Sequence, residues 1–180
     1  LLAGLPAQAF RATPRLMLHL STPAIVCATR AHGETGVIVR LMTEAHGLLG
    51  GYVAGGRGRN LRPVLIPGNL VEAELSSRSD NQLPSARLEL VTSRGPWLGE
   101  PLASAAIGWA TTLTATSLPE RHAYPALWQA LGALLEAICH APSARGWAAA
   151  LAGYSKSSLT VTGAGGKTIL YRSEEHTSEL

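Results

Sequence analysis

The residues whose types and spacing best suit chemistry are three arginines in one glycine-rich segment. Gly55–Pro63 reads GGRGRNLRP and contains Arg57, Arg59 and Arg62, in a chain of 180 residues of which only 15% are charged. Guanidinium groups without bulky neighbours can contact successive phosphates of a polynucleotide, which gives binding that depends on salt and not on base sequence. Glycine-rich segments between strands are also common as solvated turns. The segment therefore predicts either a phosphate-binding loop or a surface turn.

The distribution of charge favours the phosphate-binding interpretation. The whole chain has 15 basic and 12 acidic residues, a net charge of +3. From Cys27 to Ile66 five arginines stand against two glutamates, whereas residues 67–154 have five arginines against seven acidic residues. A polyanion would be steered to the first of these segments. Arg30 and Arg40 extend the positive surface if they face outward. Arg40 could instead lie at the rim of the folded strands, with the aliphatic part of its side chain packed on them.

Sequence patterns for catalysis and metal binding are weaker than the pattern for phosphate binding. The six histidines and the two cysteines, Cys27 and Cys139, lack the spacing of a zinc site or a disulfide framework, and neither G-x-S-x-G nor a carboxylate pair stands out. Gly163–Thr168, GAGGKT, resembles the end of a P-loop, but Val161 stands where that motif needs its first glycine, five residues before Gly166. The sequence therefore predicts no catalytic residue, no metal and no cofactor, and a nucleotide hydrolase is the least favoured alternative.

Short strands dominate the first part of the chain. Five runs of strand-like composition are separated by turn residues, at 24–29, 36–43, 48–54, 69–76 and 82–93. In the fourth run, Val71, Ala73 and Leu75 alternate with glutamates, as in half-buried antiparallel strands, while the first three runs are apolar on both faces except at Arg40. Five such strands predict a small OB-type barrel over residues 17–96, and an SH3-like barrel fits the same pattern.

Helical periodicity replaces the strand pattern after Pro96. Pro101 and Pro125 stand where the first turn of a helix tolerates proline, and alanine- and leucine-rich runs follow both. The predicted helices cover residues 101–117, 125–140 and a third segment capped by Ser143. We therefore predict an α+β chain in which a helical domain over residues 97–154 follows the barrel.

The two ends of the sequence differ from the rest. Residues 1–16 are aperiodic, rich in Ala, Pro and Leu, and precede Met17, so we expect a non-native or upstream leader. Residues 155–180 are rich in Ser, Thr and Gly without a helical stripe, and residues 172–180, RSEEHTSEL, resemble a translated sequencing adapter. We expect an out-of-frame tail here and a helical domain that is incomplete after Tyr154.

Cellular location is indicated by the apolar runs and the cysteines. The apolar runs are interrupted by polar residues and are too short to cross a bilayer. Two distant cysteines without a framework are typical of a reducing compartment. We therefore expect a cytoplasmic protein with no membrane partner.

The order of these features resembles a known family. A strand is followed by a Gly/Glu-containing turn at Gly33–Thr35, by a strand that ends in Leu-x-Thr-Glu at Leu41–Glu44, and by a glycine-led strand that enters the basic segment, Gly47–Arg62. This series resembles the N-terminal half of the RecO family of bacterial proteins. The resemblance extends with lower specificity to Tyr154. The basic segment here contains arginine without lysine, and the four-cysteine zinc site of some family members has no counterpart in this chain.

The resemblance to RecO implies a recombination mediator and not an enzyme. Such a protein binds single- and double-stranded DNA, anneals complementary strands, engages the single-strand-binding protein and, with RecR, helps to load RecA at gaps. The residues expected to contact nucleic acid are Arg30, Arg40, Arg57, Arg59 and Arg62. Tyr52 is the one aromatic residue among residues 17–96. It could stack on a base or belong to the core, so phosphate contacts should dominate.

A generic OB-type module is the main alternative function. Such a module would bind RNA or DNA, or act as an adaptor, with the same barrel and the same basic segment. The fold alone does not distinguish DNA from RNA, so the choice rests on the family resemblance.

Overall fold

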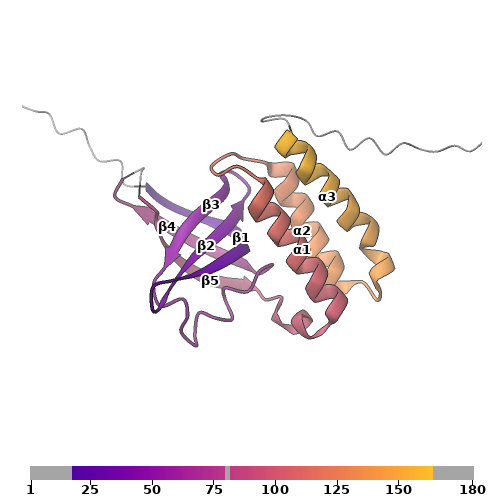
Figure 1. Ribbon diagram of the computed structural model, residues 1–180, viewed down its shortest axis with the longest axis horizontal. Coiled ribbons are helices and arrows are strands. Elements are labelled where there is room, and N and C mark those ends of the chain that lie inside the picture. Colours follow the sequence, from indigo (N-terminus) through magenta and orange to yellow (C-terminus); the bar gives the residue numbers. More distant parts are fainter. Residues whose placement is uncertain (1–17, 80–81, 164–180) are drawn as a thin grey trace, which may run out of the picture.

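Five strands close into a barrel in the computed structural model, which describes residues 18–79 and 82–163 (Figure 1). The strands are β1 (Leu18–His32), β2 (Gly36–Thr43), β3 (Gly47–Val53), β4 (Leu70–Ser77) and β5 (Ser85–Thr92). Their order around the barrel is β1-β2-β3-β5-β4, and β1 closes the ring by pairing with β4. All neighbours are antiparallel except β3 and β5, which pair in parallel. The predicted five-stranded, OB-like barrel is confirmed.

Strand β1 is long because it pairs with two neighbouring strands. Its first half pairs with β4 and its second half pairs with β2, and the register shifts between Val26 and Ala28. A bulge of this kind bends a strand, which lets one strand belong to both sides of a small barrel. The sequence pattern indicated a strand only over residues 24–29, so the structure extends it at both ends.

The barrel interior is lined by small and branched side chains. Val26, Val39, Leu41 and Leu75 are fully buried there. Gly51 also faces inward, where an added Cβ would lie only 2.8 Å from the Cβ of Ala86 on β5. Glycine at this position therefore allows β3 and β5 to approach closely enough to close the barrel.

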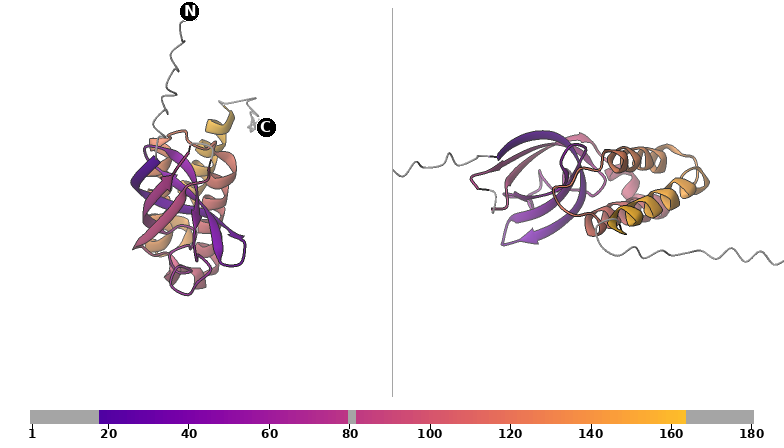
Figure 2. Two further views of the ribbon diagram at one scale, coloured as in Figure 1. Left: turned by 90° about the vertical axis from the view of Figure 1, so that its left-hand side faces the viewer. Right: turned by 90° about the horizontal axis from the view of Figure 1, so that it is seen from above.

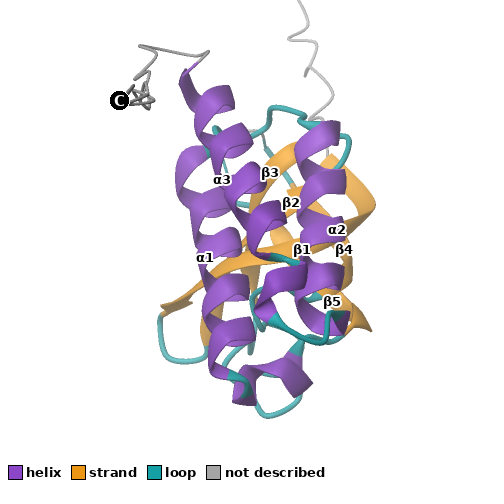
Figure 3. Ribbon diagram, turned by 90° about the vertical axis from the view of Figure 1, so that its right-hand side faces the viewer, coloured by secondary structure: helices purple, strands orange, loops and turns teal. Residues whose placement is uncertain are grey.

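Three helices cover one side of the barrel. They are α1 (Pro101–Ser117), α2 (Pro125–His140) and α3 (Ala148–Gly163). The short 3-10 turn η1 (Gly95–Gly99) precedes α1, and η2 (Ala144–Gly146) lies between α2 and α3. The first two helices begin and end where the sequence predicted. Helices α1 and α2 lie against the strands, and α3 packs on the far side of both (Figures 1 and 3). In the view from above in Figure 2, the barrel and the helices lie side by side.

A second hydrophobic core joins the helices to the barrel. Its strand residues include Cys27, Met42 and Leu48, which point out of the barrel and pack with helical residues such as Ile107 and Leu135. This packing explains why the first three strands are apolar on both faces. One face fills the barrel, and the other face is covered by α1 and α2.

Helix α3 differs from the prediction at both of its ends. Ser143 makes no side-chain capping bond and precedes η2, and α3 begins only at Ala148. The helix then continues past Tyr154 to Gly163. Its contact with α1 is a polar seam: the hydroxyl groups of Thr114 and Tyr154 lie 2.5 Å apart, and those of Ser117 and Ser158 lie 2.9 Å apart. A hydrophobic stripe cannot reveal such a seam, so the predicted end of the helical domain at Tyr154 was too early. The expectations for residues 1–16 and 172–180 lie outside the described residues.

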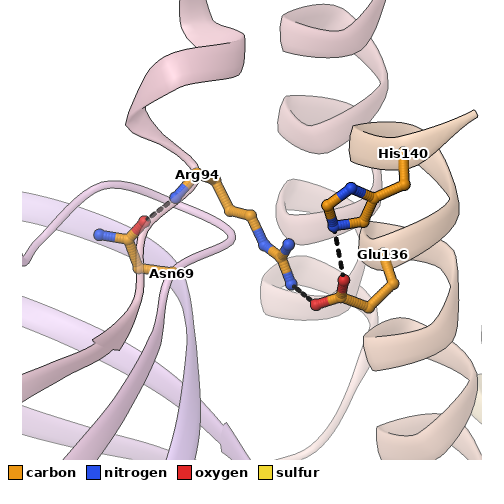
Figure 4. Close-up of polar contacts among 4 residues, drawn as sticks. All are labelled: Asn69, Arg94, Glu136 and His140. Atoms are coloured by element: carbon orange, nitrogen blue, oxygen red, sulfur yellow. Dashed lines mark hydrogen bonds and ion pairs between the residues drawn. The ribbon is translucent and has the colours of Figure 1, made fainter.

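A polar chain, buried at Asn69 and Arg94, connects the barrel to α2 (Figure 4). Asn69 is fully buried, its amide donates to the carbonyl oxygens of Pro63 and Val64 at 2.7 and 3.0 Å, and its Oδ1 accepts the backbone N–H of Arg94 at 2.7 Å. The guanidinium of Arg94 in turn binds the carboxylate of Glu136 on α2. One side chain therefore fixes both the end of the glycine-rich segment and the start of the helical half.

Replacing Asn69 should destabilise the whole chain. The Asn69→Ala change leaves one buried N–H and two partly buried carbonyl groups without their partner, at up to about 1–3 kcal/mol for each unsatisfied group. We expect the free energy of unfolding in urea to fall by about 2–5 kcal/mol, relaxation included. Asn60→Ala, an exposed asparagine of the same segment, is the matched control. Equal stability of the two variants would contradict the role of Asn69.

Acid should weaken the link between Arg94 and Glu136. The hydrogen bond from Arg94 lowers the pKa of Glu136 below its ordinary value of 4.5. The stabilisation is therefore present above about pH 4.5 and is lost as the pH falls through the lowered pKa. Thermal melts between about pH 6 and about pH 3 should show a smaller loss of Tm for Glu136→Gln than for the unmodified chain. Glu89→Gln, at an exposed site, should behave like the unmodified chain, and identical profiles for all three proteins would contradict the assignment.

Candidate nucleic-acid interface

The glycine-rich segment is a loop folded against the turn between β1 and β2. The backbone N–H of Arg57 donates to the carbonyl oxygen of Thr35, and its Nη1 donates to that of Glu34, both at 3.0 Å. Gly55 has a φ of +65°, in the left-handed region where glycine is unstrained. An added Cβ at Gly56 would lie 2.9 Å from the side chain of Val37. The loop is thus a defined turn, which we call the basic loop (residues 54–65).

The three arginines of the basic loop lie at the surface and are not paired with a described carboxylate. Arg57, Arg59 and Arg62 are all exposed. Arg57 donates to a backbone carbonyl, and Nε of Arg62 donates to the carbonyl oxygen of Arg57 at 3.0 Å. Within the described part of the chain, no carboxylate pairs with any of the three. Arg57 and Arg62 are therefore held close together, and none of the three guanidinium groups is compensated by a described carboxylate, as an anion-binding surface requires.

Arg30 and Tyr52 lie on the outer face of the barrel near this loop. In the strand registers, Arg30 pairs with Ile38 and Ile38 pairs with Tyr52, so all three occupy one row across β1, β2 and β3. Arg30 is exposed, and Tyr52 is half-buried and outside both hydrophobic cores. The ring of Tyr52 meets that of His32 edge to face, with centroids 5.9 Å apart. The structure therefore brings together four of the five predicted arginines and the predicted stacking residue at one end of the barrel.

A groove continues this surface between the β1–β2 turn and the β4–β5 connection. Its volume is about 810 Å³. The described residues that line it are His32, Tyr52, Ser76, Ser77, Arg78, Gln82, Leu83 and Ser85. In OB folds, the outer face of the second and third strands and the loops beside it bind oligonucleotides. His32 and Arg78 were missed in the sequence because each is a single residue beside a turn, and only the folded barrel places them next to Tyr52.

Arg40 lies apart from the other predicted arginines. Its Nη1 donates to the carbonyl oxygen of Ala115 at the end of α1, and its Nη2 forms an ion pair with Glu120, at 2.6 and 2.8 Å. Its side chain is 35% exposed. The prediction that Arg40 extends an outward positive track does not fit this geometry, because α1 covers its strand and Glu120 neutralises its charge. Arg40 instead joins the barrel to the helical half.

A reactive thiol, a metal site and a membrane-spanning helix each require features that the described residues lack. Burial raises the pKa of Cys27 to about 12 and raises the pKa of Cys139, so both remain protonated thiols at neutral pH. In the ranges that the structure covers, no three His, Cys, Asp or Glu residues lie close enough together to hold a metal ion. The same ranges contain no helix that is long and apolar enough to span a membrane. The exposed chemistry of this face is that of guanidinium, imidazole and phenol groups.

Comparison with known proteins identifies the barrel. Residues 17–94 match the family described as "Recombination protein O N terminal". Over these residues the chain belongs to the RecO family. The DNA repair protein RecO of Phenylobacterium zucineum is 44% identical over 119 residues, which are 65% of this chain and 49% of that protein. The corresponding protein of Caulobacter vibrioides is 40% identical over 127 residues, or 69% and 50%, and that of Rhodospirillum centenum is 44% identical over 117 residues, or 64% and 46%. The chain thus spans about half the length of the curated RecO relatives it matches.

The resemblance proposed from the sequence is confirmed by these matches. The RecO N-terminal domain covers the whole barrel and ends at Arg94, the residue that begins the link to α2. The basic loop and the Arg30–Tyr52 row both lie inside the matched residues. The candidate interface is therefore part of the RecO domain itself.

Arg40 should contribute to stability. The Arg40→Met change keeps an apolar stem of similar reach but removes the bond to Ala115 and the ion pair with Glu120. Because the pair is partly exposed, we expect the free energy of unfolding in urea to fall by about 1–2 kcal/mol. Arg30→Met, on the same face but exposed, is the matched control and should change stability by less than about 0.5 kcal/mol. If Arg30→Met were the more damaging change, the assignment of Arg40 to the domain junction would be wrong.

Proposed function

We propose that the chain binds single- and double-stranded DNA through the basic loop. The observation that carries this proposal is the set of three exposed arginines, Arg57, Arg59 and Arg62, held on one short loop without a carboxylate partner among the described residues. Each guanidinium that neutralises a phosphate releases a counterion, so binding is sensitive to salt and indifferent to base sequence. Arg30 adds a fourth charge at the same end of the barrel.

Single strands gain a further contact in the groove. Tyr52 and His32 present two rings on the outer face of β1 and β3, where one unpaired base can stack. A duplex has no free base face and is limited to phosphate contacts. The groove therefore supports a preference for single strands over duplex, with most of the affinity still electrostatic.

Annealing of complementary strands follows from the same chemistry. Two single strands repel each other through their phosphates, and arginines that neutralise the phosphates lower this repulsion. Contacts that read no base edge leave the edges free to pair. A loop that holds the backbone can thus promote pairing without covalent chemistry, so we propose a binding protein and not an enzyme.

The names of the relatives extend the proposal to a cellular role. Relatives that share the barrel are called DNA repair protein RecO. We therefore assign this chain to DNA repair and recombination in the cytoplasm. In this role it would anneal strands, engage the single-strand-binding protein and, with RecR, help to load RecA at gaps. The basic loop would supply the DNA contact for each of these steps.

The salt dependence of DNA binding tests this proposal. For a single strand, the slope of log K against log salt should fall by about 2 when Arg57, Arg59 and Arg62 are all changed to Ala, which corresponds to about 0.7 for each phosphate contact. Fluorescence anisotropy of a labelled oligonucleotide across a salt series measures the slope. Changing Arg87 and Arg145, two exposed arginines away from the loop, to Ala is the control for net charge.

The outcomes separate the proposal from its alternative. An unchanged slope in the loop variant, or an equal loss per arginine in the control, would show that the basic loop does not hold phosphates. RNA that binds as tightly as DNA of the same sequence would favour the generic OB-type module.

A further inference from the structure

A second cavity opens along the seam of the barrel, beyond the groove. Among the described residues, the register between β3 and β5 pairs Tyr52 with Ser85, where β5 begins, so the earlier residues of β3 lie beside the β4–β5 connection; an added Cβ at Gly50 would lie 3.2 Å from Leu83. Leu49 and Leu75 of the barrel core line the inner side of the cavity, and residues 120–123 of the connection between α1 and α2 line another side. The cavity has a volume of about 540 Å³. The apolar residues that line it are Leu20, Leu49, Leu75, Leu83 and Pro84, of which the first three belong to the barrel core or pack against it.

Polar groups surround the mouth of this cavity. His46 comes from the β2–β3 turn, Gln82 from the β4–β5 connection, and Arg121 and His122 from the α1–α2 connection. The imidazole rings can stack on a planar ligand, and the amide can both donate and accept hydrogen bonds. An apolar floor with a few polar groups at the rim is the usual composition of a site for a small organic group.

The rim is held in place by the domain junction. The backbone N–H of Arg121 donates to the carbonyl oxygen of Leu48 at 2.9 Å, and Arg40 holds the neighbouring Glu120. Arg121 has a φ of 60°, which is uncommon for a residue other than glycine and recurs at ligand-binding positions. The mouth of the cavity is therefore preformed by contacts that also join the two halves of the chain.

The cavity is continuous with the groove that contains Tyr52. Ser77, Gln82 and Leu83 line both spaces. Tyr52 and Leu49 are three residues apart on β3, about 10 Å along the strand, with Tyr52 on the outer face and Leu49 on the inner face. A single strand that stacks one base on Tyr52 would therefore reach the cavity well within the length of chain that one OB fold binds.

We propose that this cavity receives one unstacked nucleobase of a DNA single strand bound along the groove. The inference rests on the proposed function and adds a second, deeper base contact to it. A nucleobase is flat, apolar on its faces and polar at its edges, which matches a floor of leucines below a rim of imidazole, amide and guanidinium groups. The volume lies within the range of sites for small organic groups and leaves room for any of the four bases. A paired base cannot enter, so the cavity selects single strands.

A variant that fills the cavity tests the inference. Ala123 is exposed and lines the cavity, so Ala123→Trp should block it, whereas Ala133→Trp adds the same side chain to an exposed position of α2 that lines neither space. The probe is an oligodeoxythymidine of about 16 nucleotides, the upper site size of one OB fold, with one 2-aminopurine whose fluorescence reports its stacking. The full chain is used throughout.

The expected result is a loss of affinity without a loss of salt dependence. Ala123→Trp should bind the oligonucleotide about tenfold more weakly and abolish the change in 2-aminopurine fluorescence, while the slope against salt stays the same. Ala133→Trp should match the unmodified chain. His46→Ala, which removes one ring from an exposed turn, should give a smaller loss of affinity and of the fluorescence change. It replaces Ala123→Trp as the test if that variant does not fold.

The contrary results are distinct from a failure of the proposed function. Salt-dependent binding with equal affinity and fluorescence in both tryptophan variants and in His46→Ala would overturn the base site and leave the proposed function standing. Absence of salt-dependent binding in the unmodified chain would overturn both. Free adenosine monophosphate that competes at the cavity, while the oligonucleotide gives no fluorescence change, would replace a strand-derived base with a free nucleotide and so overturn the inference.

Discussion

The rest of the structure depends on the hydrogen bonds made by the side-chain amide of Asn69. It is fully buried between the last residues of the basic loop and the residue at which the barrel ends, and its amide group bonds to both. A side chain with fewer polar atoms could not satisfy these three backbone groups together. Through Arg94 and Glu136 the same chain of bonds reaches α2. The position of the basic loop and the position of the helices are thus set by one buried amide.

The arginines of this chain divide according to their partners. Arg40 and Arg94 are matched by carboxylates at the junction of the barrel and the helices, where they hold the two halves together. Arg57 and Arg62 bond to backbone carbonyl groups, and no described carboxylate pairs with them or with Arg59. The guanidinium groups of all three are exposed to solvent. A chain that is almost neutral over its folded part therefore presents a positive surface at one end. This separation allows phosphate binding without weakening the junction.

The local sequence pattern was enough to predict most of the fold, because the start of a helix and the course of a strand depend mainly on residues close together in the sequence. The prolines at positions 101 and 125 marked the starts of α1 and α2 correctly, and alternation marked β4. Long-range effects were not predictable in the same way. The pairing of Arg40 with Glu120 joins residues 80 positions apart, and the α1–α3 seam uses hydroxyl groups that no hydrophobic period reveals. For the site, composition identified the basic loop, but the place of His32 and Arg78 beside Tyr52 depends on the register of the closed barrel.

The central claim is that DNA lies on the basic loop and on the face of the barrel beside it. Hydrogen exchange of backbone amides, with and without a single-stranded oligonucleotide, tests this claim most directly. The account predicts slower exchange in the DNA complex at residues 54–65 and at the β1–β2 turn, with little change in α3. Protection confined to the helices, with the basic loop exchanging as in the free chain, would contradict it.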